Sequence, residues 1–109
     1  FLFKLITPLN TDNKLHDIDG ETTNIIALDC EMCGIGNDGK KSILSRVSIV
    51  NYNGGVIYDK FVKPGRGEII TDYRTKITGI TKDDIDKGIP LTKCLREVYN
   101  IMKGKRIIG

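Results

Sequence analysis

The sequence has no long apolar run, a single histidine and only three cysteines, and each scarcity limits the functions open to it. No apolar stretch approaches the roughly 18 residues that a membrane-spanning helix needs, so we expect no membrane contact. The apolar opening at residues 1–6 is too short for the core of a signal peptide. An odd number of cysteines without an export signal favours reduced thiols. We therefore expect an intracellular protein.

Length and charge are ordinary. The 109 residues, 28% of them charged, suit one globular domain or part of one, and a chain of this size can bury a core. The net charge is +3 overall, and residues 25–109 carry +5 because 15 basic and 10 acidic residues lie there. This balance permits a polyanionic partner such as nucleic acid without requiring one.

Alternation and helical spacing predict strands first and helices afterwards. We expect strands over 25–32, 45–52 and 56–62, a short helix from a cap at Thr81 through Ile85, a helix over 91–103, and the beginning of a strand over 105–109. An Asn-Gly pair within residues 51–55 favours a hairpin between the second and third strands. Gly104 is expected to end the long helix.

Residues 1–23 are predicted to form an N-terminal extension, because they are polar after the first six residues and show no sustained period. Residues 24–109 hold three expected strands, two helices and an unfinished strand, which is not a closed architecture. We therefore expect residues 24–109 to be the N-terminal part of a larger α/β domain.

The cysteines allow a redox and a zinc interpretation, and neither has the context it needs. Cys30 and Cys33 form a CxxC pair followed by glycines, whereas a redox pair needs a helix that starts at the motif. A zinc site would have to recruit Cys94 and the only histidine, His16. Alternation in the first strand points Cys30 into a core, so buried or half-buried thiols are the favoured interpretation.

Residues 34–39 match the GxGxxG pattern of dinucleotide-binding proteins, and Asp59 lies 20 residues after Gly39. That pattern works where a helix follows the glycines, because the helix N-terminus binds the pyrophosphate. Here residues 45–50 alternate small or polar side chains with valine and isoleucine, as strands do. We interpret the glycines as a loop between two strands, with dinucleotide binding as the minor alternative.

The acid pair Asp29 and Glu31 is the sequence feature that most directly indicates a catalytic site. Residues i and i+2 of a strand project from one face, about 6.6 Å apart, while Leu28, Cys30 and Met32 take the other face. Hard divalent cations prefer carboxylate oxygens, and such a pair suits two-metal cleavage of phosphodiesters. A solvated strand end is the plain alternative, because an acid pair at this spacing occurs often by chance.

Four separated segments together resemble one family. They are Asp29–Met32, Arg46–Asn51, Thr71–Thr75 and Thr78–Ile80. In this order they resemble the RNA exonuclease 4-like branch of the DEDD 3′–5′ exonucleases, over residues 24–109. The resemblance implies an RNase H-like fold, with a mixed sheet flanked by helices. It also implies release of nucleoside monophosphates from the 3′ end of single-stranded RNA, or of DNA. A role in RNA processing or ribosome biogenesis and a nuclear or nucleolar location would follow.

The resemblance gives Asp29 and Glu31 the roles of catalytic metal ligands for two Mg²⁺ or Mn²⁺ ions. By analogy, Asp29 would bridge both ions, and Glu31 would bind the ion that holds the attacking water. Both ions would stabilise the charge that develops on the cleaved phosphate.

The resemblance also implies contacts with the terminal nucleotide of the substrate. Met32 corresponds to a residue that packs against the terminal nucleoside, with a core methionine as the alternative. Arg74 would bind phosphate or ribose oxygens, and its alternative is a salt bridge to Asp72 or another acid. Tyr73 would stack on a base or serve as a buried anchor, of which the anchor is favoured.

The second and third motifs of the family, which hold the remaining metal ligands and a general-base histidine, are not found in these residues, because His16 precedes the first motif. We therefore expect the 109-residue chain alone to have little or no exonuclease activity. The alternative function is a truncated or degenerate exonuclease domain that binds nucleic acid or protein.

Overall fold

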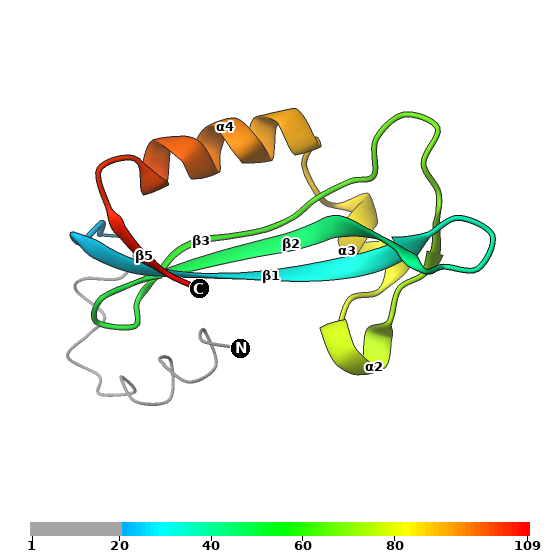
Figure 1. The fold of residues 1–109 in the computed structure, drawn as a ribbon, viewed down its shortest axis with the longest axis horizontal. Helices are drawn as coiled ribbons and strands as arrows, with labels where there is room; N and C mark the ends of the chain where they lie inside the picture. The colour runs from blue at the N-terminus through cyan, green and yellow to red at the C-terminus, as the bar shows by residue number, and fades with distance from the viewer. Residues whose placement is uncertain (1–20) are drawn as a thin grey trace. The chain divides into compact units, whose positions relative to one another are not determined.

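A computed structural model describes residues 21–109, which form a five-stranded sheet and short helices (Figure 1). The elements are β1 (Ile25–Ile35), β2 (Lys41–Asn51), β3 (Val56–Phe61), β4 (Ile70–Asp72), α2 (Thr75–Thr78), α3 (Lys82–Asp86), α4 (Leu91–Met102) and β5 (Arg106–Ile108). The strands lie in the order β3-β2-β1-β4, and β5 also pairs with β1. The first twenty positions of the extension predicted over residues 1–23 fall outside the described residues.

The described residues group into two compact units. Residues 21–29, 48–59 and 97–109 belong to the first, and residues 30–47 and 60–96 belong to the second. The boundary falls within β1, β2, β3 and α4, so each of these elements contributes residues to both units.

β1 is one strand whose two ends are buried and whose middle is not. Ile26 and Ala27 are buried near its start, and the residues at 33–35 are buried at its end. Those at 29–32 are half-buried or exposed. The strand runs three residues beyond its predicted end at residue 32, because its last residues pair with β4 in antiparallel fashion.

In the first unit, β5 pairs with the start of β1 in parallel, with Ile107 opposite Ile26. The predicted strand near residues 105–109 is thereby confirmed. The turn between β2 and β3 depends on the buried Asn51, whose side-chain oxygen accepts the backbone N–H groups of Asn53 and Gly55, both at 2.9 Å. Asparagine side chains commonly close turns in this way. The predicted hairpin is also confirmed, although β2 begins at residue 41 instead of 45.

The second unit is built on a buried apolar cluster contributed by β1, β4 and the segments near α3. Its buried members are Cys33, Ile35, Ile70, Ile80 and Ile85, against which Ile43, Phe61 and Tyr73 pack. Burying an isoleucine side chain fully contributes about 1.5–3 kcal/mol to folding. This cluster therefore contributes to the stability of the unit that holds the end of β1.

Two short elements in this unit, β4 and α2, were not predicted, since the sequence indicated no strand or helix between residue 62 and Thr81. β4 has three residues, of which only Ile70 is buried, and α2 has four. Periodic patterns need longer segments than these, so their positions are decided by tertiary pairing.

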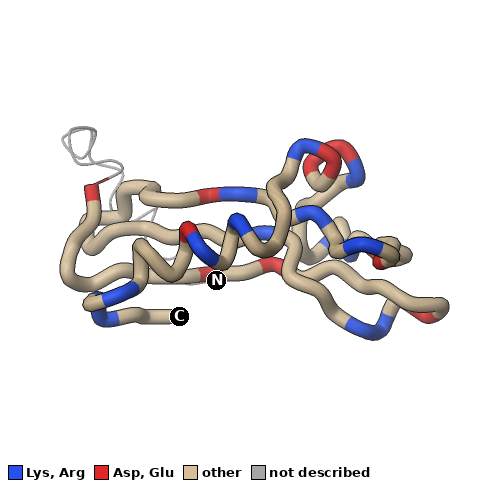
Figure 2. The backbone as a smooth tube through the Cα atoms, turned by 90° about the horizontal axis from the view of Figure 1, so that it is seen from above, with Lys and Arg blue, Asp and Glu red and all other residues tan. Residues whose placement is uncertain are grey.

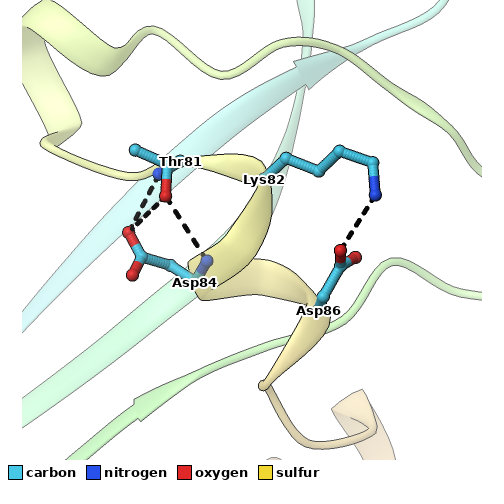
Figure 3. Close-up of polar contacts among 4 residues, drawn as sticks. All are labelled: Thr81, Lys82, Asp84 and Asp86. Carbon is cyan, nitrogen blue, oxygen red and sulfur yellow. Dashed lines mark hydrogen bonds and ion pairs between the residues drawn. The ribbon is translucent and has the colours of Figure 1, made fainter.

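Helix α3 begins as the sequence predicted, with a cap at Thr81 (Figure 3). The Thr81 hydroxyl oxygen accepts the backbone N–H of Asp84 at 3.4 Å, and the Asp84 carboxylate accepts the N–H of Thr81 at 2.9 Å. This reciprocal capping box satisfies two N–H groups that the helix end leaves unpaired. Within the same helix, the ammonium group of Lys82 donates to the carboxylate of Asp86, four residues later, at 2.9 Å. This hydrogen bond, together with the charge of Asp86, raises the pKa of Lys82.

Helix α4 matches its predicted span of 91–103 to within one residue, and Gly104 follows it with a positive φ of 74°. Its predicted apolar face is only partly covered by the described residues. Cys94 is buried, whereas Leu91 and Leu95 are 40% and 53% exposed. None of the described helices is long and apolar enough to cross a membrane.

Replacing Ile80 with alanine should lower the free energy of unfolding by about 2–5 kcal/mol, because truncating a fully buried isoleucine leaves a cavity. Ile77 provides a matched control because its side chain is 78% exposed. Ile77→Ala should change the free energy of unfolding by less than about 0.5 kcal/mol. Urea denaturation of both variants, followed by circular dichroism, measures the difference. Equal losses would show that Ile80 does not belong to the core.

Candidate functional site

The two acids that the sequence singled out lie on β1, between its buried ends. Asp29 and Glu31 are both half-buried, and their spacing on a continuous strand directs both side chains to the same face. A carboxylate in a fully buried strand would be costly unless it were paired. The middle of β1 is therefore a position where two carboxylates remain in contact with solvent.

The opposite face of β1, which carries Cys30 and Met32, is more exposed than the sequence predicted. Cys30 is exposed, so the expectation that alternation points it into a core is wrong. Met32 is also exposed, at 38%, which rules out the alternative of a core methionine. Alternation states which residues share a face, but whether that face is covered depends on the rest of the fold. Met32 is therefore available for contact with a ligand.

The cysteines do not form a site among residues 21–109. Cys33 and Cys94 are buried while Cys30 is exposed, and this part of the chain holds no group of three or more potential metal-ligating side chains. His16, the fourth ligand of the zinc interpretation, lies outside the described residues. β1 runs through the CxxC pair as a strand, so the helix N-terminus that a redox pair needs is not present there.

The glycine motif forms a loop between β1 and β2, as interpreted from the sequence, and no helix follows it. Its glycines serve close packing. A Cβ at Gly34 would overlap the carbonyl oxygen of Gly39, and a Cβ at Gly39 would lie 2.9 Å from the Cβ of Asp72 in β4. The loop therefore lies directly against the end of β1 and against β4, at distances that only glycine permits.

Arg74 holds this loop in place. Its guanidinium donates to the hydroxyl of Ser42 at 2.9 Å and to the carbonyl oxygens of Gly39 and Lys40 at 3.1 and 3.4 Å. The alternative of a salt bridge with Asp72 is wrong, because that carboxylate accepts the backbone N–H of Arg74 at 2.9 Å. Spacing in the sequence did not reveal these contacts. The close glycines were the only signal for them.

Arg74 also has an unusual backbone. Its φ of 51° makes it the only non-glycine residue with a positive φ in the described part of the chain. Such a conformation costs about 1–3 kcal/mol and persists where surrounding contacts impose it. The hydrogen bonds of its side chain and its N–H supply those contacts.

Tyr73 lies half-buried against the apolar cluster of the second unit. Its carbonyl oxygen accepts the thiol of Cys33 at 3.5 Å and the hydroxyl of Thr78 at 2.9 Å. These contacts favour the buried-anchor interpretation over base stacking. They also attach the segment after β4 to the end of β1.

The second unit contains three of the predicted nucleotide-contact residues, Met32, Tyr73 and Arg74. In the antiparallel register Gly34 lies opposite Asp72, where β4 ends. The guanidinium of Arg74 lies beside Gly34 and the loop that follows β1. Glu31 precedes Met32 on the same strand, and Asp29 lies two residues earlier.

Comparisons with known proteins place this geometry in context. The family model described as "Exonuclease" matches residues 26–109. RNA exonuclease 4 of Xenopus laevis is 49% identical over 87 residues, which are 80% of this chain and 20% of that protein. The chain spans about a fifth of the length of the curated relatives it matches.

Two solved structures have a similar fold. The PAN2 pseudoubiquitin-hydrolase-RNase module of Saccharomyces cerevisiae superposes with a TM-score of 0.64 at 24% identity, covering 86% of this chain and 18% of that one. The nuclease domain of 3′hExo, described as a DEDDh family member bound to rAMP, superposes with a TM-score of 0.51 at 22% identity, covering 78% of this chain and 46% of that one.

Gly34→Ala should lower the free energy of unfolding by about 1–3 kcal/mol, because the added methyl group overlaps the backbone of the loop. Gly65→Ala is the matched control. Its added Cβ would contact only the carboxylate of Glu68, a flexible side chain that can move away. Thermal unfolding of both variants tests the packing, and a Gly34→Ala protein as stable as the control would contradict it.

Proposed function

The chain belongs to the exonuclease family and has an RNase H-like α/β fold, and on this premise we propose that it supplies the first acidic metal ligands of a 3′–5′ exoribonuclease domain. The family and the fold class agree with those that the sequence predicted. The proposed substrate is single-stranded RNA, from whose 3′ end the domain releases nucleoside monophosphates. The similarity to RNA exonuclease 4 and the rAMP bound by 3′hExo support this choice.

The observation that carries the proposal is the position of Asp29 and Glu31 on one face of β1, in its accessible middle. The buried ends of the strand fix its backbone on either side of the acids. Each buried end belongs to its own unit, and the two acids lie on either side of the boundary between the units on one strand.

The residues present fit part of a magnesium or manganese site. Two carboxylates two residues apart match the one or two carboxylates with which proteins usually bind Mg²⁺, together with water and substrate phosphates. No third ligand groups with them among residues 21–109. Asp29 and Glu31 would therefore hold the metal ions together with ligands from the second and third motifs of the family.

Each residue of the site has a distinct proposed part. When bound, two divalent ions would stabilise charge on the attacking and leaving oxygens of the cleaved phosphate. Met32 offers an exposed apolar side chain to the terminal nucleoside. A guanidinium has five N–H donors, and three contacts bind Arg74 to the loop, so donors are left for a ribose or phosphate oxygen. Tyr73 anchors the segment that carries Arg74.

A binding module is the second candidate function. Of the family's acidic motifs, the 109 residues match only the first, Asp29 and Glu31, and the only histidine, His16, precedes it. A domain with this set alone would bind nucleic acid or protein without cleaving it. A nuclear or nucleolar location, and a role in RNA processing or ribosome biogenesis, stay predictions from the family resemblance.

Mn²⁺ added to the ¹⁵N-labelled chain should broaden the amide resonances of residues 29–32 before all others, because a paramagnetic ion broadens the nuclei nearest to it. Asp29→Asn should abolish this selective broadening, since it removes one of the two anionic ligands. Asp38→Asn is the matched control in an exposed loop and should leave the broadening unchanged. Broadening that persists in the Asp29→Asn variant would contradict the metal assignment.

The purified 109-residue chain should release little or no nucleotide from a 5′-labelled single-stranded RNA in the presence of Mg²⁺, because one acid pair supplies too few ligands and no general base. Denaturing gel electrophoresis measures the release. Steady shortening of the RNA from its 3′ end that is unaffected by Asp29→Asn would overturn both this expectation and the site assignment.

A further inference from the structure

The glycine loop, defined here as residues 36–40, and the start of β2 directly after it are held by several hydrogen bonds. Besides the bonds from Arg74, the hydroxyl of Thr71 in β4 donates to the carbonyl oxygen of Gly36 at 2.7 Å. The N–H of Gly39 donates to the same oxygen at 3.1 Å, which closes a turn within the loop. Side chains on such a loop lose little entropy of the backbone when they bind a ligand.

This loop and the start of β2 present two adjacent cations. Lys40 and Lys41 are both exposed, and neither ammonium group contacts an acid among the described residues. The nearby acids are already engaged by backbone groups: Asp38 accepts the N–H of Lys40 at 3.0 Å, and Asp72 accepts that of Arg74. Basic positions occur along much of the backbone (Figure 2). Lys40 lies at the end of the loop that Arg74 holds, and Lys41 is the first residue of β2, directly after it.

A cavity of about 500 Å³ lies beside the loop. Its wall includes Lys41 and the backbone of Gly36 on one side, and Glu68 and Ile69 on the other. Glu68, the one acid in this wall, accepts the N–H of Gly65 at 3.0 Å. Ile69 is 74% exposed and supplies an apolar surface. A cleft with a cation at one wall and an apolar side chain at the other suits a nucleotide, which combines a phosphate with an apolar base.

The loop is too far from the acids to serve the bond that is cleaved. Glu31 and the loop belong to the same unit, and β1 advances about 13 Å between Glu31 and Ile35 before the loop begins. A ligand bound at Lys40 and Lys41 therefore lies beside a different part of β1 from a ligand bound at Glu31.

We propose that Lys40 and Lys41 bind phosphates of the single-stranded RNA substrate on the 5′ side of its terminal nucleotide. This rests on the proposed function and extends it from the terminal nucleotide to the body of the strand. Two lysines on consecutive residues act as point charges that follow a flexible backbone of phosphates without reading sequence. The contact would therefore raise the affinity for longer RNA strands without favouring any particular base.

The salt dependence of RNA binding tests this proposal. Fluorescence anisotropy measures the affinity of the full 109-residue chain for a labelled 12-nucleotide RNA over a series of salt concentrations, with EDTA present to prevent cleavage. Each phosphate contact on a single strand adds about 0.7 to the absolute value of the negative slope of log K against log salt, and this absolute value is the slope compared here. The variant Lys40→Gln/Lys41→Gln should therefore lower that slope by about 1.4, and it should leave binding of a 3-nucleotide RNA unchanged.

The matched control is Lys93→Gln/Lys103→Gln, which removes the same charge from two exposed positions in and after α4. It should change the slope much less. The proposal is overturned if the loop variant keeps the wild-type slope, if both variants lower it equally, or if the chain shows no salt-dependent binding. Loss of binding to a polyglutamate peptide with an unchanged RNA slope would overturn it in favour of an acidic protein partner.

The outcome is separable from that of the proposed function, because the RNA measurement contains no metal and the Mn²⁺ measurement contains no RNA. A lowered slope together with absent Mn²⁺ broadening would support the lysine contact while removing the catalytic assignment. An unchanged slope together with selective broadening would do the reverse.

Discussion

The structure depends on one constraint, which is that β1 must be buried at both ends and accessible in its middle. Ile26 and Ala27 anchor the start, and Cys33–Ile35 anchor the end. A strand is a stiff element with a fixed side-chain period, so these anchors also set the direction of the residues between them. Asp29 and Glu31 therefore share a face without needing a contact between them. Their accessibility avoids the cost of an ionised carboxylate in an apolar core.

Near the buried end of β1, hydrogen bonds offset the strain in the backbone of Arg74. Arg74 adopts a left-handed backbone that a side chain normally avoids, and its guanidinium and N–H make hydrogen bonds only in that arrangement. The same guanidinium lies close to Gly34, where a side chain would not fit against Gly39. One residue thus links the end of β1, the loop after it and the segment after β4. A change at any of these positions reaches the strand that carries the acids.

Periodicity predicted the longer elements because their patterns repeat over enough residues to be distinctive. The span of α4, the cap at Thr81 and the hairpin at Asn51 all follow from local chemistry. β4 and α2 could not be predicted in this way, because they are decided by pairing with distant residues. The loop contacts of Arg74 join positions 32 to 35 residues apart, which no local pattern encodes. The error at Cys30 has a similar origin, because alternation assigns a face but not its cover.

The exposure of Met32 bears on how a nucleotide can lie at this site. By alternation, Met32 and Glu31 point to opposite faces of β1, although they are consecutive. A nucleotide whose sugar or base contacts Met32 while its phosphate lies near Glu31 cannot rest flat on either face. It would have to cross an edge of the strand to reach both side chains. The guanidinium of Arg74 lies near Gly34, two residues after Met32 on the same strand. On the proposed function, a nucleotide that reaches past Met32 along β1 would therefore approach Arg74.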